Sequence, residues 1–364
     1  MLANTLPLIC ACFLIVSLIA NPEIMLLSAS DSITLFLTKV FPSLFPFMVA
    51  CGIFMGSKGV SLLSKLCTPI MYPLFRLPGI ASLPFFLGML SGYPMGAKLT
   101  ATLYKENKIS LEDAEHLLGF SNNAGPLFLI GTVGTAFFHD PEIGYLLLIS
   151  TILGAITTGI LLGIFKKKSH CTSSTPPVPS PQKNFSDLLG KTIEDSLHTI
   201  LQIGGYLVFF ATLLTAIKSM PYNFLDHSPP FFQGIFSGIL EITTGTYELS
   251  QCTTTPKIAV YTASCMIVSF GGCSILGQTF GILKAVPIKK SHYILSKICN
   301  SLCSGCIFYC IFLHYEKSLL PVFANEQMAI NYQKYGILNS FFLLQSVVYL
   351  AIYISFLLRK KTKK

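Results

Sequence analysis

Two ionisable residues, Lys98 and Glu241, lie inside predominantly apolar segments of the sequence. Lys98 follows the stretch SGYPMGA, and Glu241 begins the stretch EITTG. A charged group inside an apolar, membrane-type segment is costly and therefore indicates a functional site by default. We expect Lys98 to contact an anion, with snorkelling to the membrane interface as the alternative. We expect Glu241 to carry a coupling proton or bind Na⁺, with a purely structural role as the alternative.

Polar and small residues interrupt the apolar pattern near both charges and at two further places. Glycine and proline break helices, and the freed backbone groups can bind solutes or ions. Small residues alone would also suit close helix packing, but two adjacent asparagines exceed what packing needs. The predicted solute-binding residues are Ser91, Gly92, Tyr93, Pro94, Gly96, Lys98, Ser121, Asn122, Asn123, Gly125, Glu241, Thr243, Thr244, Gly245, Ser269, Gly271, Gly272, Ser274 and Gln278.

The sequence contains no convincing catalytic or metal-binding constellation. Three of the four cysteines in CNSLCSGCIFYC (299–310) have the C-x3-C-x2-C spacing of some iron–sulfur ligands. These cysteines recur at helical spacing along an apolar segment, which is typical of helix packing by small residues. We therefore predict no enzymatic activity, no cofactor and no metal.

The composition predicts an all-α polytopic membrane protein. Of 364 residues, 52% are hydrophobic and 11% are charged, whereas ordinary soluble domains have about 25% charged residues. The apolar residues form runs of about 20, which match the hydrocarbon thickness of a bilayer. The basic residues lie near the ends of these runs, so the net charge of +9 indicates membrane orientation and not nucleic-acid binding.

Apolar runs and their interruptions predict eight transmembrane helices and two re-entrant or broken hairpins. The helices are expected at about 6–20, 35–56, 118–138, 143–165, 195–217, 258–283, 294–314 and 338–358, and the hairpins at about 79–104 and 231–250. This divides the chain into a first transmembrane half (1–165), a cytoplasmic Pro/Ser-rich linker (166–194), a second half (195–358) and a basic cytoplasmic tail (359–364). No basic residue precedes the first run, which favours a retained helix over a signal peptide.

The distribution of Lys and Arg predicts that both termini are cytoplasmic. In this topology nineteen of the 25 basic residues, Lys297 among them, fall on the cytoplasmic side and five on the other, with Lys98 inside a membrane segment. An excess of basic residues in cytoplasmic loops is the usual determinant of orientation.

The two halves of the sequence are weakly similar to each other. Residues 88–99 align with 238–249 at an offset of 150, and residues 121–128 align with 269–276 at an offset of 148. In each half a broken hairpin precedes a helix with a polar, glycine-containing stretch. The predicted topology places the hairpins on opposite sides of the membrane, which gives an inverted repeat of the kind found in secondary transporters.

Several motifs indicate a family. They are FPSLFPFMV (41–49), LPFFLGMLSGYPMGAKL (83–99), KISLEDAEHLLGFSNNAGPLFLIGTVG (108–134), LEITTG (240–245) and SFGGCSILGQ (269–278). With them the chain, from about Asn21 to about Tyr315, resembles the YlbJ (SpoVV) family of sporulation integral membrane proteins in the nucleoside-recognition or Gate-domain superfamily. The resemblance implies a repeat plan similar to that of concentrative nucleoside transporters. It also implies movement of dipicolinic acid across the outer forespore membrane.

Three functions follow as expectations. The first is a secondary transporter of a small aromatic or carboxylated solute, by resemblance dipicolinate, with Lys98 and residues 121–125 on the anion and Glu241 with residues 269–278 as the opposing half-site. The second is a nucleoside or other metabolite transporter, and the third is a non-transporting membrane scaffold in spore maturation. The expected partners are an anionic small molecule, a coupling H⁺ or Na⁺ and the lipid bilayer, with no nucleic acid; a homo-oligomer is left open.

Overall fold

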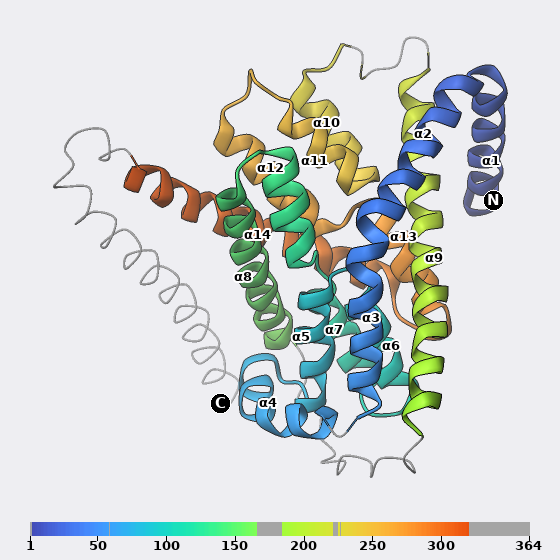
Figure 1. The fold of residues 1–364 in the computed structure, drawn as a ribbon. Coiled ribbons are helices and arrows are strands. Elements are labelled where there is room, and N and C mark those ends of the chain that lie inside the picture. The colour runs from blue at the N-terminus through green and yellow to red at the C-terminus, as the bar shows by residue number, and fades with distance from the viewer. Residues whose placement is uncertain (1, 58, 166–183, 221–224, 226, 320–364) are drawn as a thin grey trace.

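The computed structural model describes residues 2–57, 59–165, 184–220, 225 and 227–319 (Figure 1). Within these residues all regular secondary structure is helical, and there is no strand. The first half contains α1 (Leu2–Ala20), α2 (Pro22–Leu35), η1 (Phe36–Val40), α3 (Phe41–Met55), α4 (Gly59–Phe75), η2 (Gly79–Ala81), α5 (Ser82–Ser91), α6 (Met95–Lys105), α7 (Leu111–Ser121), η3 (Leu127–Phe137) and α8 (Pro141–Phe165). The second half contains α9 (Phe185–Lys218), α10 (Pro230–Leu240), α11 (Ile242–Ser250), α12 (Lys257–Phe270), α13 (Gly272–Ile282), η4 (Leu283–Ala285) and α14 (Lys290–Leu319).

The predicted all-helical membrane-type fold is confirmed, with four to six candidate spans in the described residues. Four helical segments are long and apolar enough to cross a membrane, namely Pro141–Ile164, Phe185–Lys218, Lys290–Tyr315 and Lys257–Ala285, the last of which comprises α12, α13 and η4. Two bent pairs raise the number to six, namely Leu8–Ala20 with Pro22–Val40, and Leu44–Met55 with Val60–Phe75. The predicted helix at 338–358 and the predicted tail at 359–364 lie outside the described residues.

The predicted gap between the first two helices is wrong, because residues 22–35 form α2. Pro22 occupies the first turn of α2, where its missing N–H would have no intrahelical partner in any case. It therefore starts a helix after Asn21 and does not mark a loop. The chain bends by 109° between α1 and α2.

The predicted linker (166–194) ends too late, because α9 begins at Phe185. Its first turns lie against α3, where Gly52 faces Thr192 and Gly56 faces Leu188. The absence of side chains at these two glycines lets α9 approach closely. Residues 166–183 lie outside the described residues.

Four breaks in the described residues fall inside segments that were predicted as hairpins or as continuous helices, two of them at the predicted hairpins. The break between α5 and α6 falls at 92–94, and the break between α10 and α11 falls at Glu241. The helices expected as continuous at 118–138 and 258–283 are also broken, at 122–126 and at Gly271. Gly92 (φ +84°) and Gly271 (φ +93°) adopt positive φ values that residues with a Cβ rarely reach. At the break at 122–126, Pro126 disfavours helical geometry in the preceding residue.

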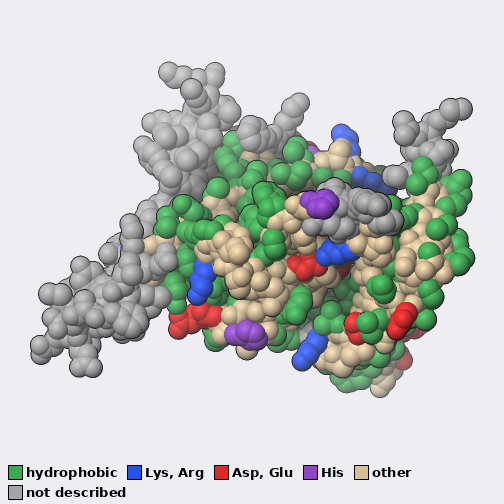
Figure 2. Space-filling model, turned by 90° about the horizontal axis from the view of Figure 1, so that it is seen from above, with side chains coloured by type: hydrophobic (Ala, Val, Ile, Leu, Met, Phe, Trp, Pro, Cys, Tyr) green, Lys and Arg blue, Asp and Glu red, His purple; other side chains and the backbone are tan. Residues whose placement is uncertain are grey.

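The outer surface of the molecule is apolar, whereas several polar side chains are fully buried. Ile19 and Leu62 are 76% and 71% exposed, while Asn122 and Lys297 are 0% exposed. Figure 2 shows apolar side chains over much of the visible face and few charged ones. In a lipid environment, ionisable groups within helices face the bundle interior, so the buried polar residues mark the place to search for a site.

Candidate functional site

A buried lysine, Lys297 of α14, lies among residues of the broken helices. Its ammonium donates hydrogen bonds to the backbone oxygen of Asn122 at 2.8 Å, to Asn123 Oδ1 at 3.1 Å and to the Tyr93 hydroxyl at 3.2 Å. It also lies 5.2 Å from the centroid of the Tyr93 ring. Within the described part of the chain, no carboxylate forms an ion pair with Lys297. In the described residues the ammonium is therefore surrounded by neutral oxygens and the Tyr93 ring.

Further hydrogen bonds connect these residues to the end of α12. Asn300 Nδ2, one turn after Lys297, donates to Asn123 Oδ1 at 2.8 Å and to the Ser269 carbonyl at 3.4 Å. The Tyr93 hydroxyl donates to the Val268 carbonyl at 3.0 Å. The first hairpin, the α7–η3 break and the end of α12 thus meet at α14. Four segments that are far apart in sequence form one polar centre.

Asn122 extends this polar centre toward α13. Its Nδ2 atom donates to Thr279 Oγ1 at 3.0 Å and to the Tyr293 hydroxyl at 2.9 Å. Since Asn123 accepts from Lys297 and Asn300, both predicted asparagines contact the second half of the chain. Asn123 Nδ2 instead donates to the Phe120 carbonyl at 2.7 Å, which fixes the orientation of its amide.

Several buried polar atoms near the breaks have no hydrogen-bond partner among the described residues. They include Ser121 Oγ, Asn122 Oδ1, Ser269 Oγ, Ser274 Oγ, Gln278 Oε1 and Asn300 Oδ1. An unsatisfied buried polar group costs about 1–3 kcal/mol and in native proteins usually has an unseen partner such as water, an ion or a ligand. Five of these six residues are among those predicted from the sequence to bind solute.

The predicted glycines allow backbones to approach closely. A Cβ at Gly96 would lie 2.2 Å from the Ser121 carbonyl oxygen, and one at Gly92 would lie 2.7 Å from the Gly125 nitrogen. A Cβ at Gly245 would lie 2.1 Å from the Gly238 Cα. Glycine therefore occurs at these positions because backbone atoms of a neighbouring segment lie where a side chain would be.

Lys98 lies on α6 and contacts α9. Its ammonium donates to the Asp195 carbonyl at 3.0 Å and to Thr199 Oγ1 at 2.8 Å. Among the described contacts it shares no hydrogen bond with residues 121–125. The buried cation beside the asparagines is Lys297, which lies in the protein interior and not among the exposed basic residues. Residue 297 falls on the face of α14 that packs inward, with Tyr293 and Asn300.

Glu241 caps the first turn of α11. Its carboxylate accepts hydrogen bonds from the backbone N–H of Thr243 at 3.0 Å and of Thr244 at 2.7 Å, and from Thr244 Oγ1 at 3.0 Å. A carboxylate at a helix N-terminus satisfies free N–H groups and complements the helix dipole. Of the roles expected for Glu241, the hydrogen bonds directly support the structural role, as the N-cap of α11.

Replacing Glu241 by alanine should lower the free energy of unfolding by about 1–2 kcal/mol, because two helix N–H groups lose their acceptor. The thermal unfolding midpoint of the purified protein in detergent measures the effect. Glu241→Asp is the matched control, since aspartate is a good N-cap and should keep most of the stability. Equal midpoints for wild type and Glu241→Ala would show that the cap contributes nothing.

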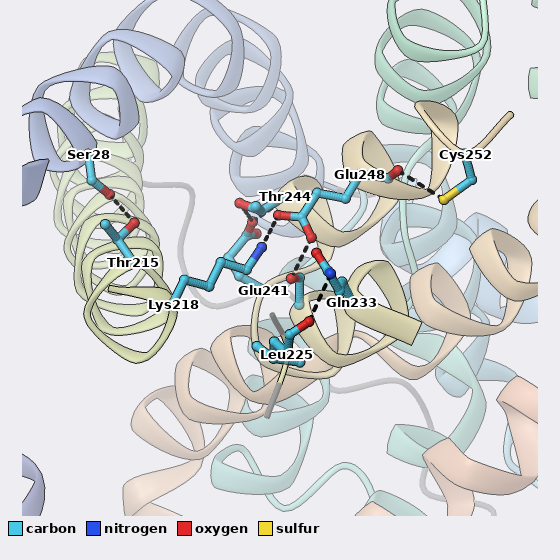
Figure 3. A network of polar contacts seen from close by, with 10 residues as sticks. Ser28, Thr215, Lys218, Leu225, Gln233, Glu241, Thr244, Glu248 and Cys252 are labelled. Carbon is cyan, nitrogen blue, oxygen red and sulfur yellow. Dashed lines mark hydrogen bonds and ion pairs between the residues drawn. The ribbon is translucent and has the colours of Figure 1, made fainter. Parts of the chain in front are cut away.

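An ion pair attaches the second hairpin to the end of α9. Figure 3 shows Lys218 of α9 beside Glu248 of α11, and the two form a salt bridge. Ser237 of α10 donates to Glu248 Oε2 at 2.7 Å. The carboxylate therefore joins both arms of the hairpin to α9. Neither Lys218 nor Glu248 is among the site residues predicted from the sequence.

The chain matches known proteins over this region. The family model described as "Gate: Nucleoside recognition" matches residues 37–139, which include Tyr93, Asn122 and Asn123. The chain is also 29% identical, over 318 residues, to the sporulation integral membrane protein YlbJ of Bacillus subtilis (strain 168), with 79% of this chain and 77% of that protein covered. The chain is similar to YlbJ. The resemblance to the YlbJ family inferred from the motifs is thereby confirmed.

No solved structure matches this YlbJ-like chain significantly. No solved relative therefore shows how a ligand would lie among the residues around Lys297.

A sequence signal for Lys297 exists in α14. Tyr293, Lys297, Asn300 and Ser304 recur at intervals of four, three and four residues, so they share one helix face. All four are buried. A polar stripe on an otherwise apolar membrane helix faces the protein interior, and this pattern would have separated Lys297 from the lysines at helix ends.

Proposed function

We propose that this protein is a secondary transporter for a small carboxylated aromatic solute in the sporulating cell. The observation that carries the proposal is the buried ammonium of Lys297, which lies among broken helices and has no carboxylate partner in the described residues. Removing a charge from water is costly unless it is compensated. A bound anion would supply the missing counter-charge, and the similarity to a sporulation membrane protein supports the cellular setting.

Dipicolinate, the solute implied by the family resemblance, suits the chemistry of this polar centre. It is a planar aromatic dianion, so a buried ammonium complements the charge of its carboxylates. The helix N-termini that follow the breaks, at Leu127 and Gly272, add backbone N–H groups that favour anions. The outer forespore membrane is the proposed location on the same grounds.

The attachment of the two hairpins to α9 supports an inverted repeat. Lys98 of the first hairpin contacts Thr199 in the middle of α9, whereas Glu248 of the second hairpin contacts Lys218 at its end. At 1.5 Å per residue, these positions on α9 are about 29 Å apart along the helix, close to the hydrocarbon thickness of a bilayer. Figure 1 shows α10 and α11 beside the upper part of α9 and α6 beside its lower part.

In the proposed architecture the hairpins enter from opposite sides, and eight spans include the one predicted at 338–358. Both termini are then cytoplasmic. Alternating access follows when one repeat moves relative to the other around a central site.

Reconstituted protein should take up labelled dipicolinate above the level of protein-free liposomes, and excess unlabelled dipicolinate should suppress this uptake. Excess nucleoside at the same concentration is the specificity control and should not suppress it. Uptake indistinguishable from that of protein-free liposomes would contradict the proposal.

A nucleoside is the second candidate solute, because the matching family model is described as nucleoside recognition. Thermal shift with a panel of nucleosides and aromatic dicarboxylates separates the two, since a ligand stabilises the folded state in proportion to the logarithm of its concentration over Kd. Stabilisation by nucleosides alone would favour the second candidate. No stabilisation by either class, with defective spore assembly in a deletion strain, would favour a scaffold.

A further inference from the structure

The oxygen atoms around the Lys297 ammonium come from two different interruptions of helical structure. Asn122 and Asn123 belong to the α7–η3 break, and Tyr93 belongs to the α5–α6 break. The Asn122 carbonyl lies at the C-terminal end of α7, where the helix dipole is negative. The set consists of one backbone carbonyl, one amide oxygen and one hydroxyl.

This set of oxygens has the chemistry of a monovalent-cation site. Unwound backbone carbonyls and the C-terminal ends of half-helices are the groups that coordinate Na⁺ in transporters built from discontinuous helices. The set contains no carboxylate, so it is suited to one positive charge and not to two. A lysine ammonium is a compact single charge with three N–H donors, and here each donor has one oxygen partner.

A second observation comes from residues that belong to, or lie next to, this hydrogen-bond network. Asn122 Oδ1, Asn300 Oδ1 and Ser121 Oγ are buried and have no hydrogen-bond partner among the described residues. Asn122, Asn300 and Ser121 are each 0% exposed. Asn122, whose carbonyl accepts from the ammonium, and Asn300, whose amide donates to Asn123, therefore carry oxygen acceptors that the ammonium does not use. Rearrangement of these side chains would let them join the coordination of a free cation if the lysine side chain were absent.

We propose that Lys297 is a built-in substitute for a coupling cation: its ammonium occupies a monovalent-cation site formed by Tyr93, Asn122 and Asn123. The positive charge is therefore part of the chain, and the protein binds its solute without Na⁺. The statement about solute binding rests on the proposed transport function, whereas the cation site is testable without it.

Thermal unfolding of the purified protein tests the cation site. The variants are wild type, Lys297→Ala and Lys98→Ala, each measured in choline, sodium and methylammonium chloride at equal ionic strength. Lys297→Ala should unfold at a lower temperature in choline, and its midpoint should rise by about 3 °C or more as Na⁺ or methylammonium increases. The wild-type midpoint should not distinguish the salts. The Lys98→Ala midpoint should also be the same in the three salts. The side chain that this variant lacks lies at a partly exposed position, where its ammonium contacts α9.

A Lys297→Ala midpoint that is the same in all three salts overturns the cation site. If Lys297→Ala does not fold, wild-type protein provides the test: dipicolinate uptake into liposomes should be equal in choline and sodium media. A Na⁺ requirement for wild-type uptake overturns the proposal while leaving the transport function intact. Absence of uptake in both media contradicts the transport function, and the salt response of Lys297→Ala still decides the cation site.

Discussion

Replacing Lys297 by methionine should reduce dipicolinate affinity about a hundredfold. Removing one partner of a buried, hydrogen-bonded charge pair costs about 2–5 kcal/mol, and each 1.4 kcal/mol is a factor of ten. The substitution leaves the oxygen atoms of Tyr93, Asn122 and Asn123 without the ammonium that they accept from. Methionine is unbranched and of similar length, so the packing volume of α14 is largely kept.

Isothermal titration with dipicolinate and uptake into liposomes measure the effect of Lys297→Met. Lys284→Met is the matched control, because Lys284 is an exposed lysine on η4 outside the polar centre and its loss should leave binding unchanged. Wild-type affinity in Lys297→Met would remove the anion-binding role. An equal loss in both variants would point to a general electrostatic effect of the basic surface.

Replacing Gly245 by alanine should destabilise the folded protein by about 3 kcal/mol. The new methyl group would lie 2.1 Å from both the Cα and the nitrogen of Gly238, and backbone atoms of a packed helix cannot rotate away. Overpacking of this kind typically costs about 1–3 kcal/mol and occasionally more. The intrinsic helix preference of alanine recovers at most about 1 kcal/mol, so the clash dominates.

Gly205→Ala provides the control for this prediction. Gly205 is exposed on α9, and a Cβ there would meet nothing within 4 Å. This variant should be as stable as wild type or up to about 1 kcal/mol more stable. Thermal unfolding in detergent compares the two alanine variants. Equal midpoints would show that α10 and α11 can separate without cost.

Local sequence signals predicted the all-helical fold and the two hairpin breaks. Glycine and proline act on the backbone where they stand, so the interruption at 92–94 could be predicted from neighbouring residues alone. The same logic failed at Pro22, because a proline in the first turn starts a helix as readily as it ends one. It also failed at Asn184–Glu194, where packing on glycines of α3 extends α9 beyond its apolar stretch.

The candidate site was predicted only in part, for a topological reason. Asn122 and Asn123 were identified because two polar residues in an apolar region are locally unusual. Lys297 was assigned to the cytoplasmic side because its neighbours in sequence resemble a helix end. Its partners lie 174 to 204 residues earlier in the chain, and no local pattern specifies which segments pack together.

The same separation in sequence has a consequence for how the protein is made. The α7–η3 break carries backbone groups that lipid cannot satisfy, and in the described part of the chain the Asn122 carbonyl receives a hydrogen bond from Lys297 of α14. During synthesis, residues 122–123 emerge from the ribosome long before Lys297 does. A nascent chain that ends before α14 therefore holds an unsatisfied polar break within the bilayer, and insertion of α14 completes the interior. We expect chains truncated before Lys297 to be recognised and degraded by membrane quality control, even though they contain most of the apolar spans.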